Sequence, residues 1–429
     1  MKPSTTEASH PSRAWSVAFA SLGFCGLSTC ASEEFVSPAQ QASMMGSTIL
    51  SGYVDTSVMW SATAPKDAGA VAAFPNTIRM PGRLYDTAAR MNGFNLNVVS
   101  VELDRPLSNE SWSVGYHVQV LFGPDVPLRN NYSLASGATE QVGLNGAYVV
   151  ARAPVGNGLE LRLGYFTSPL GYEVYDSHQN PNYSHSYGYF IEPKAHTGLT
   201  AKYDFADWCS VMGGVANSYS AFIDGPLTHR KTSKTYLGLV TFNAGAFWRR
   251  DATLSLGYTG GNTATSAATD SFPRIHSFYA GARIPLYFTG LSLGLSYDYQ
   301  ANFAAGVPAV FLFPAGPMSS YANAAAMYLN YDIAKWQLRA RGEYATATAG
   351  NTILASRGAF SSSRPMFGPN DDKFVGLTGT VGYRFWENVV TRFEARWDRD
   401  VAGGVPVFGT AAHPLRNSVT VGVNVIYRF

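Results

Sequence analysis

The chain ends in a segment with a strict two-residue repeat, and this repeat constrains the fold more than any other feature. In SVTVGVNVIYRF, residues 418–429, the odd-numbered positions are Val, Tyr or Phe, and the even-numbered positions are mostly small or polar. Successive side chains of a β-strand point to opposite sides, so the segment is predicted to be a strand with one apolar and one polar face. Its length fits the roughly 9–11 residues with which a tilted strand crosses a membrane.

The same alternation recurs upstream, for example in VVTRFEARWDRD (389–400), WQLRARGEY (336–344), SVGYHVQVLF (113–122) and LELRLGYF (159–166). In several of these segments one face carries repeated arginine and glutamate. Such a face cannot lie unpaired in a dry core. It belongs either to the water-filled interior of a barrel or to the solvated face of a soluble sandwich, and the connections decide between the two.

Sixteen segments of this kind can be assigned, and the connections between them alternate between short and long. The long connections are Ser61–Asn92, Pro124–Thr139, Ser168–His196, Ser220–Lys234, Gly261–Arg274, Ala301–Tyr321, Ala347–Lys373 and Asp400–Asn417. Short periplasmic turns and long outer loops are typical of outer-membrane barrels, in which the last strand closes onto the first and leaves no exposed edge. The predicted fold is all-β: a transmembrane antiparallel β-barrel of about sixteen strands with short periplasmic turns and long extracellular loops.

Composition and charge agree with this fold. Charged residues make up 14% of the chain, against roughly 25% in an ordinary globular protein. Aromatic residues also make up 14%, and the mean hydropathy is −0.05. The body of the chain contains no apolar run of about 18 residues, so no helical span is expected. The net charge of +2 and the lack of a basic run argue against a nucleic-acid partner.

The N-terminus is typical of a secretory signal, with Lys2 and Arg13 before an apolar stretch and small residues. The domain prediction is a signal peptide over 1–31, a short periplasmic lead over 32–47 and a barrel over 48–429. A short membrane anchor and a lipoprotein box at LSTC (27–30) remain alternatives. Removal of the signal would leave Cys209 alone, which excludes an intramolecular disulfide and a cysteine zinc site from the mature chain.

Aromatic residues gather at the ends of the predicted strands, where membrane proteins place interfacial girdles. The expected girdle residues are Trp60, Trp112, Tyr165, Trp208, Tyr219, Trp248, Trp336, Tyr344, Trp386, Tyr427 and Phe429. The general preference of aromatic residues for strands accounts for part of this pattern.

The stretch LELRLGYFTSPLGYEVYDSHQNPNYSHSYGYFIEPKAHTGLTAKYDF (159–205) resembles the β-barrel porin type 2 (OmpL-like) family. The likeness rests on a Gly-x-Phe strand end, a GYE, an Asn-Pro before a Tyr-Ser-x-Ser-Tyr cluster, and a Pro before HTG. It implies a passive or weakly selective pore for small hydrophilic solutes in the lipid of a Gram-negative outer membrane, with no catalytic residues and no cofactor. The terminal Phe429 resembles the signal read by the barrel-insertion machinery, and sixteen-stranded porins are often homotrimers.

The connection Ser168–His196 is rich in tyrosine and histidine, and it is the candidate for a loop that folds inward and narrows the channel. Tyrosine offers a flat apolar face and a hydroxyl to a passing solute. The expected constriction residues are Tyr172, Glu173, Tyr175, Asp176, Tyr183, His185 and Tyr187. An ordinary outer loop packed over the rim is the alternative. The histidine spacing contains no pair that would seed a metal site, and no G-x-S-x-G motif supports a hydrolase.

The polar faces of the strands supply the expected pore-lining residues Arg162, Arg283, Arg339, Arg341, Glu343, Arg384, Arg392, Glu394, Arg396 and Asp398. Two hypotheses follow. An arginine-rich wall would favour anions in a water-filled pore. A ladder of cross-strand Arg–Glu pairs would only stiffen the wall. The competing functions are a diffusion porin, a plugged structural or adhesive barrel, and an outer-membrane barrel enzyme.

Overall fold

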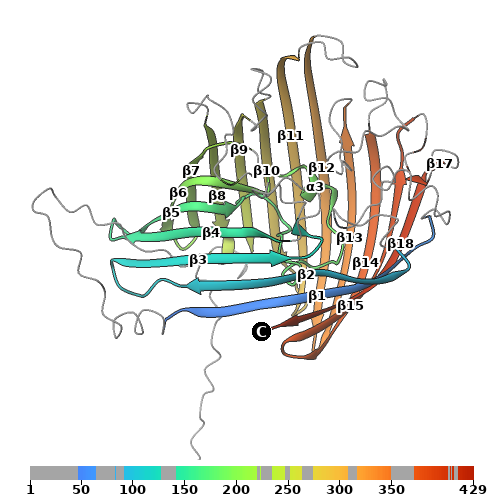
Figure 1. Ribbon diagram of the computed structural model, residues 1–429, viewed down its shortest axis with the longest axis horizontal. Coiled ribbons are helices and arrows are strands. Elements are labelled where there is room, and N and C mark those ends of the chain that lie inside the picture. Colours follow the sequence, from blue (N-terminus) through green and yellow to red (C-terminus); the bar gives the residue numbers. More distant parts are fainter. Residues whose placement is uncertain are drawn as a thin grey trace, which may run out of the picture.

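The structure is a computed structural model that describes residues 47–63, 83, 91–126, 142–219, 223, 234–246, 252–262, 274–307, 316–348, 372–403, 406, 408–409 and 414–429. Within these residues sixteen strands form one closed antiparallel barrel (Figure 1). Its strands are β1 Ile49–Ser61, β2 Gly93–Arg105, β3 Ser113–Phe122, β4 Val142–Ala153, β5 Leu159–Thr167, β6 Ala195–Ala206, β7 Cys209–Ala216, β8 Thr235–Asn243, β9 Thr253–Asn262, β10 Arg274–Pro285, β11 Leu291–Val307, β12 Gly316–Ile333, β13 Trp336–Ala347, β14 Asp372–Trp386, β15 Val389–Asp400 and β18 Asn417–Arg428. The predicted fold class is confirmed.

Each barrel strand pairs with its neighbours in the sequence, and β1 closes the ring by pairing with β18. At this seam the backbone N–H of Phe429 donates to the Gly52 carbonyl, and the Gly52 N–H donates to the Phe429 carbonyl, each at 3.0 Å. The alternating valines of the last segment therefore lie in a strand that has partners on both sides, β1 and β15. Closure satisfies the backbone groups that would otherwise be exposed to lipid.

Short turns alternate with long connections around the barrel, as the sequence predicts. One connection differs clearly from the prediction, because the two strands beside it occupy most of the expected connection 301–321. β11 continues to Val307, and β12 begins at Gly316. Their extended ends pair with each other and rise beyond the neighbouring strands in Figure 1. The last long connection also holds a two-stranded hairpin, β16 Phe408–Gly409 with β17 Pro414–Leu415.

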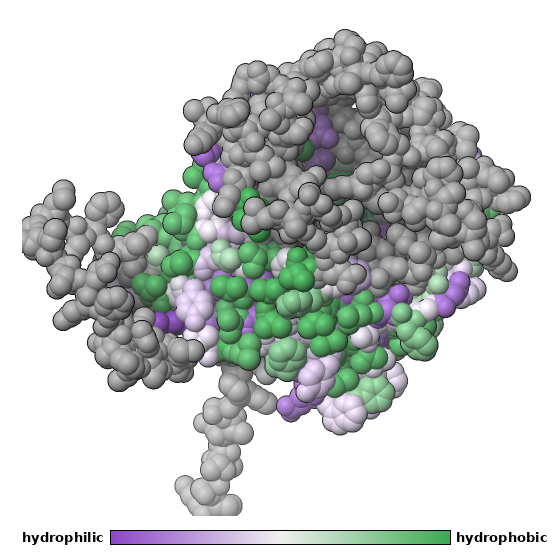
Figure 2. Space-filling view, viewed as in Figure 1, coloured by the Kyte–Doolittle hydropathy of each residue, from purple (hydrophilic) through white to green (hydrophobic). Residues whose placement is uncertain are grey.

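Apolar side chains face outward and polar side chains face the lumen on most strands. On β18, for example, Val423 and Val425 are exposed on the outside, while Thr420 and Asn424 are buried inside. Figure 2 shows hydrophobic side chains gathered over the wall in front, where β1 to β4 run. The outward surface of the described strands is therefore suited to lipid.

Most of the predicted girdle residues are exposed on the outside of the barrel, as expected: Trp60, Trp112, Trp208, Trp336, Tyr344, Trp386, Tyr427 and Phe429. Two predictions are wrong. Tyr165 is buried against Leu144 and Ala195, and Tyr219 is buried with its hydroxyl 2.6 Å from the Ser277 hydroxyl oxygen. Both residues are used for internal packing near the ends of their strands. Trp248 lies outside the described residues.

No helix in the described ranges is long and apolar enough to span a membrane. The predicted signal peptide and nearly all of the predicted lead, residues 1–46, lie outside the described residues. A short helix, α3 Tyr187–Ile191, lies in the connection between β5 and β6 and packs against β11, β12 and β13. Figure 1 shows it inside the outline of the barrel.

Candidate functional site

The connection between β5 and β6, residues 168–194, crosses the lumen and docks on the far wall; we call it the inward loop. Its two ends are held together by the Ser168 N–H, which donates to the Lys194 carbonyl at 2.9 Å. Its middle contacts β13, β14 and β15, which lie about half a turn around the ring from β5. The loop therefore spans the barrel from one side to the other.

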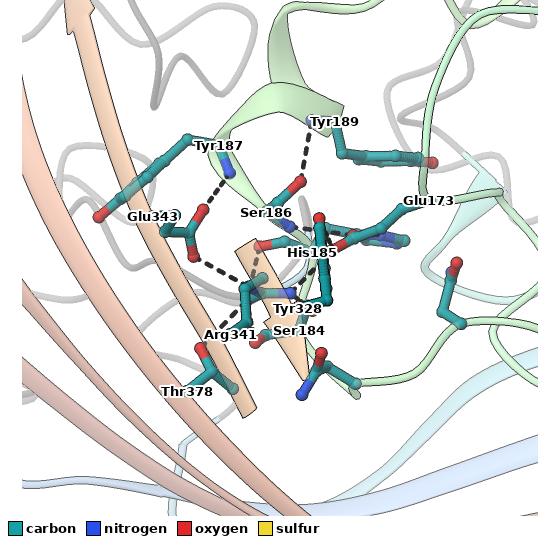
Figure 3. Close-up of polar contacts among 12 residues, drawn as sticks. Glu173, Ser184, His185, Ser186, Tyr187, Tyr189, Tyr328, Arg341, Glu343 and Thr378 are labelled. Atoms are coloured by element: carbon teal, nitrogen blue, oxygen red, sulfur yellow. Dashed lines mark hydrogen bonds and ion pairs between the residues drawn. The ribbon is translucent and has the colours of Figure 1, made fainter. Parts of the chain in front are cut away.

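Glu173 joins the start of the inward loop to its middle and to the wall (Figure 3). One carboxylate oxygen accepts hydrogen bonds from the Arg341 guanidinium and the Tyr328 hydroxyl, each at 2.9 Å. The other lies 3.0 Å from both the His185 Nδ1 and the Ser186 N–H. A single buried carboxylate thus uses both oxygens to hold four donors from three parts of the chain. Charge-assisted hydrogen bonds of this kind are stronger than hydrogen bonds between neutral groups.

The charges of Glu173 and its neighbours are set by burial and by each other. Burial opposes the ionised form of Glu173, but the Arg341 charge and the His185 and Ser186 donors outweigh it and lower the pKa to about 2. Burial lowers the pKa of His185 to about 4, against the opposing influence of Glu173. His185 is therefore neutral at pH 7. Because an ionised carboxylate only accepts, the proton of His185 lies on Nδ1.

Arg341 begins a ladder of alternating charges on the inner face of β13 and β15. Its Nε donates to Glu343 at 3.0 Å, and Glu343 also receives Arg396 Nη2 at 3.2 Å. Arg396 continues to Asp398 at 2.8 Å. The side chains of Arg341 and Arg396 are 0% exposed, so the inward loop covers them completely. Every charge in this ladder has an opposite neighbour within ion-pair distance.

Carboxylates of the ladder and of the neighbouring Glu394 also hold the backbone of the inward loop. Glu394 accepts the N–H groups of Tyr183 at 2.6 Å and Ser184 at 3.0 Å. Glu343 accepts the N–H of Tyr187 at 2.6 Å, and the Tyr187 hydroxyl donates to Asp398 at 2.5 Å. Irregular backbone inside a membrane barrel needs such partners, because lipid and apolar walls offer none.

Arginines hold the carbonyl groups of the same loop. Arg341 donates to the Ser184 carbonyl at 2.7 Å, and Arg396 donates to the His185 carbonyl at 2.6 Å. Arg392 Nη1 reaches the carbonyls of Ser177, Asn180 and Asn182 at 2.9–3.2 Å. The wall thus presents acids to the loop N–H groups and arginines to the loop carbonyls.

Residues 175–178 of the loop contact the wall near β1, β2 and β3. Asp176 accepts a hydrogen bond from Gln119 at 2.8 Å. The His178 ring lies 4.7 Å from the Tyr53 ring, centroid to centroid, and Tyr175 packs on the cluster that contains Tyr53. Tyr172 stacks on Tyr328 of β12 at 4.2 Å. All seven predicted constriction residues therefore lie in a loop that is folded into the lumen.

Two parts of this arrangement are not evident from the strand pattern. Arg83, from the first long connection, is 2% exposed and donates to Asp55 of β1 at 2.6 Å and to the Tyr183 carbonyl at 3.2 Å. The second part is a bay of small residues under α3, formed by Ala322, Ala324, Ala345 and Ala347. Inward alanines that alternate on two adjacent strands are visible in the sequence and could have indicated that a segment packs there.

A cavity of about 520 Å³, which we call the chamber, lies between the inward loop and the short-turn ends of the strands. Residues 178–181 and Tyr172 of the inward loop form one side. The wall contributes five arginines, each from a different strand: Arg283, Arg339, Arg384, Arg392 and Arg428. Asp332 is the one carboxylate among the lining residues that the structure describes, and it accepts from Arg339 at 2.6 Å.

The structure divides nine of the ten predicted pore-lining residues into two sets and places the tenth apart from both. Arg283, Arg339, Arg384 and Arg392 line the chamber. Arg341, Glu343, Glu394, Arg396 and Asp398 also point inward, but the inward loop buries them and they are not open to the lumen. Arg162 lies apart on β5, with its guanidinium over the rings of Tyr148 at 4.6 Å and Phe166 at 5.7 Å.

One group of side chains has the composition of a cation site. Across the described ranges, only Glu102, Asp104 and His117 bring three donor atoms within 4.8 Å of one another. His117 Nδ1 lies 3.3 Å from Glu102 and 3.4 Å from Asp104. A protonated His117 paired with both carboxylates accounts for the same geometry without an ion. The sequence prediction did not name this group.

A sequence profile of the family described as "Putative beta-barrel porin-2, OmpL-like" matches residues 47–429. Among solved structures, an anion-selective porin from Comamonas acidovorans is 13% identical, with 89% of this chain and 99% of that chain covered and a TM-score of 0.55. The outer membrane channel DcaP of Acinetobacter baumannii is 11% identical, with 89% and 97% covered and a TM-score of 0.54.

The trimer form of OmpT, an outer membrane protein of Vibrio cholerae, is 12% identical, with 89% and 99% covered and a TM-score of 0.54. At these identities the likeness concerns the fold. No curated protein matches the chain in sequence. The profile spans the barrel from β1 to the last residue, so the chain belongs to the OmpL-like β-barrel porin-2 family and is a channel-forming porin of the Gram-negative outer membrane.

Proposed function

We propose that this porin is a passive channel for small hydrophilic solutes, that the inward loop forms its constriction, and that the chamber gives it a preference for anions. The observation that carries the proposal is the split between paired and open charges. The arginines Arg341 and Arg396 under the inward loop are paired with carboxylates, while the chamber holds five arginines and one carboxylate. A wall of one sign raises the local concentration of the opposite ion.

The hydrogen bonds of the inward loop support its role as a fixed constriction. Its backbone N–H groups are held by Glu343 and Glu394, and its carbonyls by Arg341, Arg392 and Arg396. Movement of a loop with this many buried polar contacts would break several hydrogen bonds at once, which is unfavourable. The channel is therefore expected to have one dominant conductance level. As a separate point, we propose that the protein carries out no chemical reaction.

Planar-bilayer recording of the refolded protein under a KCl gradient tests both parts. We expect steady single-channel steps and a reversal potential with the sign of anion preference. The variant Arg283→Gln/Arg384→Gln should shift the reversal potential towards cations. Arg399→Gln, on the exposed outer side of β15, is the matched control and should leave it unchanged.

Two outcomes would contradict the proposal in different ways. Steps with unchanged reversal potential in the double variant would remove the chamber as the source of selectivity. A folded, heat-modifiable barrel without steps would indicate that the inward loop plugs the lumen. In that case the structural or adhesive barrel would be the better description.

We also propose a homotrimer, because the outer wall has an apolar hollow of about 540 Å³ that a second barrel could cover. Small residues form its floor, Ala340, Gly342, Gly379 and Ala395, and larger apolar residues stand around it, Met327, Leu377, Trp397 and Val419. Gly379→Trp should reduce the trimer seen by cross-linking in membranes. Gly238→Trp is the control, since a side chain there also meets open space but lies on β8. An undiminished trimer in Gly379→Trp would place the interface elsewhere.

The two ends of the chain lead to separate proposals about its export. We propose cleavage after Ala31, which N-terminal sequencing of the outer-membrane form would test. We also propose that Phe429 is read by the insertion machinery. Removal of Phe429 should reduce the amount of folded barrel in outer membranes, and normal insertion would contradict this role. The residue Phe429 is 51% exposed at the β1–β18 seam and is accessible for recognition.

A further inference from the structure

The chamber has the features of a binding site as well as a passage. We propose that it binds a small organic anion carrying two or more carboxylate or phosphate groups, and that Arg392, Arg283 and Arg384 are its ligands. This inference rests on the proposed anion-preferring channel and names the class of solute that it retains. The argument starts from hydrogen-bond donors in the chamber that lack acceptors.

Arg392 provides the first donor. The residue is 4% exposed and lines the chamber. Its Nε donates to Asn424 at 3.0 Å, and its Nη1 donates to three loop carbonyls. Its Nη2 is buried and has no acceptor in the part of the chain that the structure describes. A buried guanidinium N–H without an acceptor is costly, so Nη2 would gain an acceptor by turning towards a ligand oxygen in the chamber.

Arg283 and Arg384 provide the next donors. They stand near the ends of β10 and β14, and both line the chamber. Neither guanidinium has an ion pair or hydrogen bond to the described residues, whereas Arg339 is paired with Asp332 and Arg428 donates to the Glu387 carbonyl at 2.8 Å. Two guanidiniums with free donors, Arg283 and Arg384, therefore line one space together with Arg392, whose unpartnered Nη2 is buried at its edge, and no carboxylate in the described lining pairs with them.

The size and chemistry of the chamber define the ligand class. Its volume of about 520 Å³ lies within the roughly 300–1,000 Å³ of small-molecule sites. Guanidinium groups match carboxylate and phosphate geometry, because each can donate two parallel hydrogen bonds. The donors lie on three separate strands. A ligand with more than one oxyanion group can contact all three of them, whereas a single halide ion can contact only one or two.

Citrate and inorganic phosphate are suitable probes, added to single channels that carry chloride current, with sucrose as the neutral control. We expect citrate to reduce the current in a saturable way at concentrations where sucrose has no effect, and phosphate to do so more weakly. Arg283→Gln/Arg384→Gln should raise the half-blocking concentration of citrate about tenfold or more, as expected from the loss of charge-assisted hydrogen bonds. Arg399→Gln should not change it.

Calorimetric titration of citrate into the detergent-folded protein keeps the test independent of conduction. Saturable heat that is lost in the double variant supports the site even in a barrel that shows no steps, which separates it from the failure of the channel proposal. A channel that prefers anions but is blocked equally by citrate and sucrose would overturn the binding site and leave the channel proposal intact. Citrate binding that is unchanged in Arg283→Gln/Arg384→Gln would also overturn it, since the ligand would then lie elsewhere.

Discussion

Replacement of Glu173 by glutamine should release the inward loop from the wall. The carboxylate is 4% exposed and satisfies four donors, of which Arg341 is also buried. Removing one partner of a buried ion pair costs about 3–5 kcal/mol. In the variant Arg341 keeps its ion pair with Glu343 at 3.0 Å, and the glutamine oxygen can still accept a hydrogen bond. The destabilisation of the docked loop is therefore taken at the lower end of the range, about 3 kcal/mol. This corresponds to roughly a hundredfold increase in the ratio of released to docked loops.

Amide hydrogen exchange of the folded barrel measures this ratio directly. The informative amides are Tyr183 and Tyr187, because their acceptors are Glu394 and Glu343 and not Glu173. If the loop leaves as a unit, both should exchange about a hundredfold faster in Glu173→Gln. Single-channel records should show a more frequent state of higher conductance.

The matched control is Glu110→Gln, which removes a carboxylate from an exposed short turn. It should change neither exchange nor conductance. Unchanged exchange of Tyr183 and Tyr187 in Glu173→Gln, with a normally folded barrel, would refute the reasoning. It would mean that the remaining contacts hold the loop without the carboxylate.

Three further perturbations address the same loop. Acidification should weaken docking of the inward loop, because the pKa values of His185 and Glu173 are both lowered in the docked state. The contribution of neutral His185 to the free energy of docking is complete above its ordinary pKa of 6.5. It falls by about 3 kcal/mol as the pH approaches 4. The contribution of Glu173 to docking is lost only below its ordinary pKa of 4.5, as the pH falls towards 2. A change in loop exchange between pH 7 and pH 4 therefore reports mainly on His185. Equal amide exchange rates of the loop at these two pH values, after correction for the intrinsic rate, would contradict the role of His185. Ala345→Trp should displace α3 by overpacking the alanine bay, at a cost of about 1–3 kcal/mol. Ala325→Trp, on the exposed side of β12, should leave α3 in place. A wild-type conductance in Ala345→Trp would contradict the packing of α3 in the alanine bay. Tyr187→Phe should speed loop exchange by a factor of about 10, because the hydroxyl that donates to buried Asp398 is lost, and an unchanged rate would show that this hydrogen bond contributes nothing.

The barrel could be predicted because its rules are local. The two-residue repeat gives each strand its faces, and the alternation of short and long connections gives the topology, so β18 and β13 were assigned with nearly correct bounds. Predictions failed where packing beyond the strand decides the outcome. Tyr219 follows the same aromatic pattern as Trp208, but its hydroxyl turns inward to Ser277 and the residue is buried.

The accessibility of individual charges could not be predicted from the sequence. Arg339 and Arg341 are two residues apart on one face of β13, and the sequence pattern treats them alike. In the structure Arg339 lines the chamber, while Arg341 is completely covered by the inward loop. The difference arises from a contact between residues 168 positions apart in the chain, Glu173 and Arg341. No periodicity within a strand encodes a contact of this kind.

The inward loop assigns the two hypotheses about the arginine wall to different parts of that wall. Where the loop docks, opposite charges must pair, because unpaired charges would be buried without water; the ladder from Arg341 to Asp398 meets this demand and stiffens the wall. Where the loop leaves the chamber open, water can solvate unpaired guanidiniums, and Arg283 and Arg384 remain without carboxylate partners among the described residues. On the proposed function, constriction and selectivity depend on different side chains of the same strands, so loop docking and ion preference are expected to change independently of each other.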